Sequence, residues 1–312
     1  MSAAEAPICG ACFGTDLSLW AEARDIEYFS VPESFSYFQC RSCGALSIFP
    51  VPENRLGAIY PSNYYSFAAQ SQSFAEKIKE QLDRRIFSSL FREIGGDNPD
   101  RDFSALDVGG GTGWLLERAR RAEPRLKRTV IVDLDKKAGE GARKSGHEYY
   151  QGRIEDYDTT EKFDLIVMLN LIEHVRDPVG VLKKTRSILA TGGRILIKTP
   201  NYDSLDARIF RHRSWAGLHC PRHWVLFTPE SFRSAAVRAG LTIQQLKLTQ
   251  GAPFWSCSML NELNRLGWVK VDRERPAWRH PLYPVFILMF SAFDFARLPF
   301  MRASQMFAVL AN

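Results

Sequence analysis

A cluster of glycines follows an acidic residue in the stretch ALDVGGGTGWLLERA at residues 105–119. Gly109, Gly111 and Gly113 can adopt backbone conformations that a side chain hinders, and they let a ligand approach the main chain closely. Glycines placed between a hydrophobic run and a helical pattern indicate a nucleotide-containing ligand. The dinucleotide spacing Gly-x-Gly-x-x-Gly does not fit, because its third position, counted from Gly109, falls on Trp114.

The acidic residue Asp107 stands on the expected strand just before these glycines. A carboxylate at this place would repel a pyrophosphate, but it would attract a cationic ligand. S-adenosylmethionine carries an ammonium and a sulfonium group, so it suits both the glycines and the carboxylate. We therefore expect Asp107 and the three glycines to bind this cofactor.

Four of the six cysteines form two Cys-x-x-Cys pairs, Cys9 with Cys12 and Cys40 with Cys43. Two such pairs are typical of a zinc ion held by four thiolates. A closed site of this kind has no open coordination position, so it stabilises structure and does no chemistry. A redox-active cysteine pair or unrelated buried thiols are the alternatives.

The elements that position these groups follow from the hydrophobic pattern. Apolar residues recur at every fourth position from 74 to 94, which predicts a long helix that ends at two glycines. From 103 onward, hydrophobic strands alternate with helices near 113–122, 136–145, 177–189 and 229–239. This alternation predicts an α/β fold with a doubly wound, mostly parallel sheet. Ligands of such sheets bind at the carboxyl ends of the strands.

Further motifs fall in order along residues 103–250, and there the sequence resembles the class I S-adenosylmethionine-dependent methyltransferases. The resemblance implies a Rossmann-like sheet of seven strands. It also implies that Asp133, which ends VIVDLD, binds both ribose hydroxyls of the cofactor. Glu155 and Asp156 in GRIEDY match the segment beside the adenine. Asn170, in FDLIVMLNLIEHV, matches the strand end beneath the methyl donor.

The cysteine pairs, the stretch YPSNYY and PRHWVLFTPESF together resemble bacterial methyltransferases with an N-terminal zinc-binding domain. Several of these act on nucleotide-linked sugars or in surface-glycan assembly, which implies a small-molecule acceptor here. The expected organisation has five parts: a zinc module at 1–60, a linker and long helix at 61–100, a catalytic domain at 101–250, an insertion at 251–302 and a last strand at 303–312.

Methyl transfer to a hydroxyl or a carbon acid needs a base near the donor. His174, His223, Tyr64 and Tyr65 are the candidate catalytic residues, because they lie near the predicted site. His219 is a third imidazole on the same loop as His223. For His174 the alternative is a structural hydrogen bond to the main chain. Tyr64 and Tyr65 have an alternative role as a lid over the donor.

Residues 251–302 combine many aromatic residues with basic ones. We expect these residues to form a helical subdomain that packs on the sheet or makes a contact in a homodimer. The composition also suits the alternative of a peripheral contact with lipid headgroups. The longest apolar run, at 281–293, is too short to span a bilayer.

Composition adds little to the choice of substrate. The net charge of +6 is spread along the 312 residues, and no lysine-rich arm or Asn-Pro-Pro-Tyr motif favours nucleic acid. The first residues do not read as a signal or transit peptide, so we expect a cytoplasmic protein, peripheral to the inner membrane if 251–302 contacts lipid. A nucleic-acid or protein methyltransferase and a non-catalytic scaffold are the alternative functions.

Overall fold

The computed structural model describes residues 6–61, 74–96, 98 and 100–312. Its larger sheet has seven strands in the order β10-β11-β8-β7-β4-β5-β6. These strands are β4 (Phe103–Val108), β5 (Leu126–Asp133), β6 (Glu148–Gln151), β7 (Phe163–Leu169), β8 (Leu189–Pro200), β10 (Thr242–Thr249) and β11 (Gln305–Ala311). β11 runs antiparallel to both β10 and β8, whereas the pairs from β8 to β6 are parallel. The predicted doubly wound, mostly parallel sheet of seven strands is confirmed, and its last strand is antiparallel.

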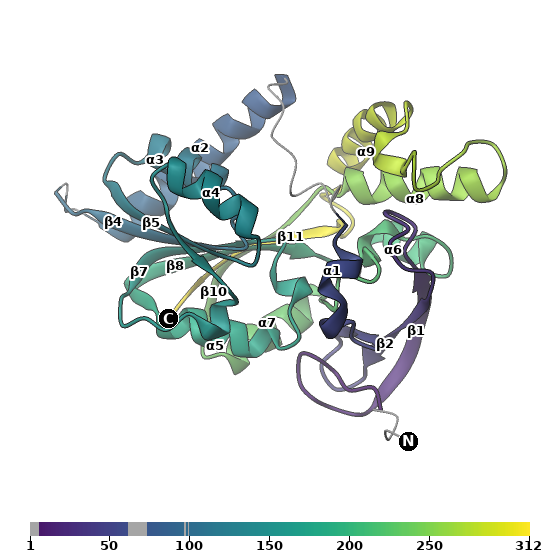
Figure 1. Ribbon diagram of the computed structural model, residues 1–312, viewed down its shortest axis with the longest axis horizontal. Coiled ribbons are helices and arrows are strands. Elements are labelled where there is room, and N and C mark those ends of the chain that lie inside the picture. The colour runs from purple at the N-terminus through teal and green to yellow at the C-terminus, as the bar shows by residue number, and fades with distance from the viewer. Residues whose placement is uncertain (1–5, 62–73, 97, 99) are drawn as a thin grey trace.

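Helices cover both faces of this sheet (Figure 1). On one face lie α2 (Phe74–Gly95), α3 (Trp114–Ala122) and α4 (Lys136–Lys144), and on the other lie α5 (Pro178–Ser187) and α7 (Pro229–Arg238). The central strands are hydrophobic at successive positions because both faces are covered. On β7, for example, Ile166 packs into the core with α5 and α7, and Leu165 and Val167 pack into the core with α2 and α3.

A second, antiparallel sheet follows the chain's N-terminus, in the order β1-β2-β3-β9. It contains β1 (Leu17–Arg24), β2 (Ser34–Cys40), β3 (Leu46–Phe49) and β9 (Val225–Leu226). The turn η1 (Glu53–Arg55) and the short helix α1 (Leu56–Ile59) come after β3. Because β9 belongs to the segment after β8, the sheet of the predicted module at 1–60 extends into the catalytic part of the chain.

The segment between β8 and β9 carries α6 (Leu205–Phe210) and the turn η5 (Ala216–Leu218). It packs against the N-terminal sheet in a shared core that includes Trp20, Tyr37 and Trp215. Tyr37 donates hydrogen bonds to the carbonyls of Leu218 and His223, both 3.1 Å long. The two sheets are therefore joined through a continuous buried interface.

The insertion before β11 is helical, as predicted. It forms a hairpin of α8 (Ala252–Arg265) and α9 (Tyr283–Arg297), with the turn η6 (Ala277–Arg279) between them (Figure 1). Trp255 stacks on Phe290, with ring centroids 5.1 Å apart and ring planes 15° apart. Among the described residues, none of the helices is long and apolar enough to cross a membrane.

Candidate functional site

The glycine turn after β4 has the backbone that its sequence predicts. Gly109, Gly111 and Gly113 have φ angles of +76°, +54° and +85°, which favour glycine. A Cβ on Gly113 would lie 2.4 Å from His147, so close packing requires this glycine. A Cβ on Gly111 would meet nothing within 4 Å. Gly111 thus presents bare backbone to open space, where a ligand can approach.

Asp133 ends β5 beside this turn. Its carboxylate accepts hydrogen bonds from the backbone N–H groups of Gly111 (2.8 Å) and Asp135 (2.9 Å). Each oxygen keeps a further lone pair for a ligand hydroxyl. The carboxylate is therefore fixed at the edge of the glycine turn, in the position expected of a ribose ligand.

Asp107 is buried on β4 directly below the turn. Burial raises its pKa well above the usual range, and the Asp133 carboxylate raises it further. A cation bound nearby would offset the cost of keeping this carboxylate ionised. The donor set of Asp107, Asp133 and the glycine backbone thus fits the ammonium and ribose of S-adenosylmethionine.

The other expected cofactor residues lie at the carboxyl ends of neighbouring strands. Glu155 and Asp156 are exposed on the turn η3 (Ile154–Asp156), after β6. Asn170 is exposed after β7 with a φ of +52°, and its N–H bonds to the carbonyl of Lys198. The next residue, Leu171, lies against Gly109. Their contacts with the cofactor stay predictions.

The four predicted metal ligands come together. The sulfurs of Cys9, Cys12, Cys40 and Cys43 all lie within 4.8 Å of one another, and two pairs are 3.5 Å apart. A tetrahedral zinc with Zn–S bonds of about 2.3 Å needs sulfurs about 3.8 Å apart. A hydrogen bond from Cys43 lowers the pKa of Cys9 to about 5, although burial opposes this shift. The arrangement and chemistry of these thiols fit the ion.

Three histidines meet at the carboxyl end of β7, beside the N-terminal sheet. The ring centroids of His174 and His223 are 4.7 Å apart, and those of His219 and His223 are 4.9 Å apart. His174 lies on the turn η4 (Ile172–His174), whereas the other two lie between η5 and β9. The predicted catalytic histidines are thus brought together from two separate segments.

Hydrogen bonds fix the proton positions of two of these imidazoles. Nδ1 of His223 lies 2.8 Å from the carbonyl oxygen of Gly217, and Nδ1 of His174 lies 3.0 Å from that of Arg222. A carbonyl only accepts, so each Nδ1 carries the proton and each Nε2 keeps a lone pair. Nδ1 of His174 also lies 2.9 Å from the hydroxyl of Tyr60. Both rings can therefore accept a proton at Nε2.

The surroundings keep these rings neutral. Burial lowers the pKa of His174 most, and the neighbouring His219 and Arg222 add to the shift, which brings the pKa to about 3. Burial likewise lowers the pKa of His223 well below its usual value, with His174 and His219 adding to the shift. A neutral imidazole has the free lone pair that a base needs, but the lowered pKa makes each ring a weak base unless a nearby negative charge stabilises its protonated form.

Glu173 is completely buried beside His223. Its Oε2 accepts a hydrogen bond of 2.9 Å from Thr199, whereas its Oε1 has no hydrogen-bond partner among the described residues and lies 3.9 Å from Nε2 of His223. Burial raises the pKa of Glu173 to about 8. Glu173, His174 and His223 form the second group of described residues whose donor atoms lie within 4.8 Å of one another.

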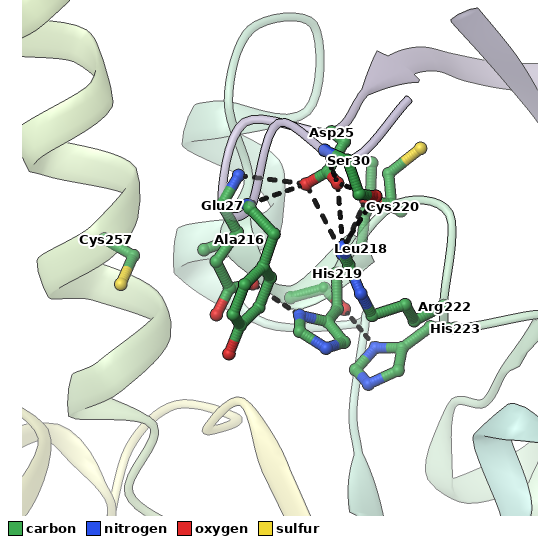
Figure 2. Close-up of polar contacts among 12 residues, drawn as sticks. Asp25, Glu27, Ser30, Ala216, Leu218, His219, Cys220, Arg222, His223 and Cys257 are labelled. Atoms are coloured by element: carbon green, nitrogen blue, oxygen red, sulfur yellow. Dashed lines mark hydrogen bonds and ion pairs between the residues drawn. The ribbon is translucent and has the colours of Figure 1, made fainter. Parts of the chain in front are cut away.

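Arg222 connects the histidine segment to the N-terminal sheet, a role that the sequence did not predict. Its side chain is buried and makes a 2.7 Å ion pair with the buried carboxylate of Asp25 (Figure 2). It also donates to the carbonyl of Ile59 and lies over the ring of Tyr28. Asp25 and Arg222 are 197 positions apart, so no local pattern could have paired them.

His219 pairs with a residue of the N-terminal part as well. Its Nδ1 contacts the carboxylate of Glu27 (Figure 2). Residues from β1, η5 and α8 line a cavity beside this pair. Its volume of about 20 Å³ holds about one water molecule. This cavity is too small for an acceptor substrate. The predicted residues Tyr64 and Tyr65 lie outside the described residues, so their role stays a prediction.

The sheet order, the antiparallel β11 and the glycine turn beside Asp133 define a class I S-adenosylmethionine-dependent methyltransferase fold. The profile of a family described as a methyltransferase domain matches residues 74–246, which is more than half of the chain. The chain therefore belongs to this methyltransferase family, and the resemblance predicted from the sequence is confirmed.

Individual relatives agree with this assignment. A ubiquinone biosynthesis O-methyltransferase of Parvibaculum lavamentivorans is 29% identical over 197 residues, covering 56% of this chain and 74% of the relative. A protein of the same name from Ruegeria pomeroyi is 28% identical over 131 residues, covering 39% of this chain and 51% of the relative. This second match spans about half of the relative's length. The structure of coclaurine N-methyltransferase aligns with a TM-score of 0.50 at 13% identity, over 84% of this chain and 82% of that one, and shows a shared fold.

Proposed function

We propose that this protein transfers a methyl group from S-adenosylmethionine to a hydroxyl of a small-molecule acceptor. The observation that carries the proposal is the pair of neutral imidazoles, His174 and His223, at the carboxyl end of β7. The glycine turn after β4 lies at the same edge, because β4 and β7 are parallel neighbours. An acceptor in contact with both groups would meet the methyl donor and a base together.

The residues of the chain have distinct roles in this reaction. S-adenosylmethionine, when bound, supplies a methyl group on a positively charged sulfur. Asp133 and the backbone of Gly111 hold the ribose, and Asp107 faces the positive end of the ligand. The bond from the acceptor oxygen to the methyl carbon would replace the carbon–sulfur bond, whose electron pair would stay on the sulfur. Nε2 of His223 receives the proton of the hydroxyl.

Glu173 supports the protonated state of His223. A proton on Nε2 places a positive charge 3.9 Å from Oε1 of Glu173. An ionised Glu173 stabilises that charge. Because the pKa of Glu173 is about 8, the ionised fraction of this carboxyl group increases as the pH rises through 8. We therefore expect the turnover rate to increase with pH as Glu173 loses its proton.

The N-terminal part has a structural role in the proposal. We infer one zinc ion on Cys9, Cys12, Cys40 and Cys43, which holds the turn before β1 and the turn at the end of β2 together. The ordered sheet then presents Asp25 and Glu27 to the histidine segment. Zinc does no chemistry on the acceptor in this arrangement, because four thiolates leave no open coordination position.

The acceptor class follows from two lines of support. Relatives named for ubiquinone biosynthesis O-methylation favour a hydroxyl acceptor. The N-terminal cysteine module favours a nucleotide-linked sugar or a surface-glycan precursor, both of which carry hydroxyl groups. A nucleic-acid substrate is disfavoured, since the basic residues do not gather in one block of the sequence.

The test compares His223→Ala with His212→Ala, an exposed histidine on the same segment. With a panel of hydroxylated acceptors, we expect His223→Ala to lower turnover by about 10²- to 10⁴-fold. The affinity for S-adenosylmethionine should stay within about twofold, as expected when an interaction made only in the transition state is lost. His212→Ala should keep normal turnover. Normal turnover of His223→Ala on a confirmed acceptor would show that the base lies elsewhere.

A further inference from the structure

The charged residues of α9 point toward the protein rather than toward solvent. Asp294 is completely buried and accepts hydrogen bonds from Nε1 of Trp255 and from the N–H of Gly251. Arg297 is also buried and pairs with Asp294 at 2.7 Å. Because these partners lie on the inner side of the hairpin, the only ionisable groups between 284 and 297 are turned away from the outer face of α9.

The outer face of α9 is apolar and exposed. Val285, Leu288 and Phe295 are 57%, 74% and 67% exposed, and Met289 beside them is 48% exposed. Their spacing of three and four positions places them on one side of the helix. Phe300, which follows α9, is 86% exposed. A helix in water normally has the opposite arrangement, with charges outside and apolar residues inside.

A basic segment borders this apolar face. Residues 266–282, which connect α8 to α9, contain four basic and two acidic residues. All four basic residues are exposed, and so is the indole of Trp268, at 75%. Exposed aromatic and aliphatic residues next to exposed arginines and lysines match the two parts of an anionic bilayer, its acyl boundary and its headgroups.

We propose that the outer face of α9 docks on the surface of an anionic lipid bilayer, with the segment 266–282 at the headgroups. The inverted charge arrangement of the helix supports a lipid partner, since an aqueous face would not favour buried Asp294 and exposed Leu288. The net positive charge of the connecting segment supports an anionic lipid surface. Figure 1 shows α9 on the side of α8 away from the N-terminal sheet. The binding does not require the methyl-transfer activity.

The test is flotation of the purified full-length protein with two kinds of vesicle. One kind contains phosphatidylcholine and phosphatidylglycerol, and the other contains phosphatidylcholine alone. We expect flotation with the anionic vesicles, weaker flotation with the neutral ones, and a loss of binding as salt is raised. Absence of flotation with anionic vesicles at low salt would overturn the proposal.

Two matched substitutions locate the contact. Leu288→Asp and Val237→Asp introduce the same charge at residues that are 74% and 72% exposed, on α9 and on α7. We expect Leu288→Asp to reduce vesicle binding by about tenfold or more, because a charge replaces an apolar side chain that would enter the lipid on docking. Val237→Asp should bind within about twofold of the unchanged protein. Equal effects of both substitutions would also overturn the proposal.

A second copy of the chain is the competing occupant of this face. Light scattering of the protein without lipid, before and after Leu288→Asp, distinguishes the two cases. A dimer that dissociates on this substitution, with no flotation of either form, would assign the face to self-association and overturn lipid docking. Binding of S-adenosylmethionine is measured on the same samples, so failure of the proposed reaction and failure of membrane docking are separate results.

Discussion

Arg222 and Asp25 form an ion pair in which neither side chain has any exposed surface. Burial raises the pKa of Asp25, but the charge of Arg222 and its hydrogen bonds lower it more, to about 2. Asp25 also accepts hydrogen bonds from the N–H groups of Tyr28 and Ser30. One carboxylate thus fixes both the turn after β1 and the segment that carries the histidines.

Replacing Asp25 with Asn should lower the free energy of unfolding by about 3–5 kcal/mol, because Arg222 would remain buried without its counter-charge. Asp16→Asn is the control. Asp16 pairs with Arg41 at 3.6 Å, and both side chains are more than 60% exposed, so that change should cost about 1 kcal/mol or less. Urea unfolding measures both. Similar losses would show that Arg222 finds another partner.

Metal analysis should find one zinc per chain. Cys9→Ser should lower this content and the thermal stability together, since a structural zinc site contributes folding energy. Cys257→Ser, at a buried cysteine outside the cluster, should keep the zinc. Two metal equivalents, one of them lost in Glu173→Gln, would contradict the predicted count and locate a second ion at Glu173, His174 and His223.

Asp133→Ala should weaken binding of S-adenosylmethionine. Each lost hydrogen bond to the charged carboxylate is worth on the order of 1.5–3 kcal/mol, and calorimetry measures the affinity. Asp135→Ala is the control, because its side chain caps α4 by accepting from the N–H of Lys137. That variant should lose helix stability and keep its affinity. Unchanged binding in Asp133→Ala would place the ribose elsewhere.

The free energy of unfolding should decrease as the pH rises from 6.5 to 8, because of the buried carboxyl group of Glu173. Its pKa is about 8 when folded and 4.5 as a reference value, so the folded state holds a proton that the unfolded state has lost. This contribution is fully present below pH 4.5 and is lost as the pH rises through about 8. The slope reaches about 1.4 kcal/mol per pH unit.

His174 does not interfere in this window. The pKa of His174 is lowered to about 3 from a reference of 6.5, so its contribution changes below pH 6.5 and has the opposite sign. Glu173→Gln should therefore flatten the unfolding free energy between pH 6.5 and 8, measured by urea titration at several pH values. Parallel curves for the two proteins would mean that Glu173 is ionised when folded.

The sequence predicts the larger sheet well because its strands and helices have distinct periodicities. Helix α2 shows the limit of such patterns. The predicted stripe advances by four residues, but an α-helix turns every 3.6 residues, so the stripe drifts around the helix. Leu82 is 52% exposed for this reason, whereas Phe87 and Phe91, outside the predicted stripe, are buried.

The candidate site could be predicted from the sequence where its residues form a local motif or follow an expected strand. The glycine turn and the cysteine pairs carry their spacing locally, and His174 and His223 follow strand ends. Glu173 is adjacent to His174 in the sequence. Its raised pKa, however, results from complete burial, and no sequence pattern indicates that burial. The pairing of β9 with β3 and of Arg222 with Asp25 depends on tertiary contacts across the whole chain.

The pairing of β3 with β9 determines which segments have to be exchanged together in a chimeric protein. Leu46 pairs with Leu226, and Ser47 with Val225, so the N-terminal sheet is completed by a strand encoded nearly 180 positions later. A chimera that exchanges residues 6–61 alone would join a foreign β3 to this β9 and leave Arg222 facing a foreign turn. A chimera between relatives should therefore exchange residues 6–61 together with residues 201–227. These two segments are far apart in the sequence, but they form one structural unit.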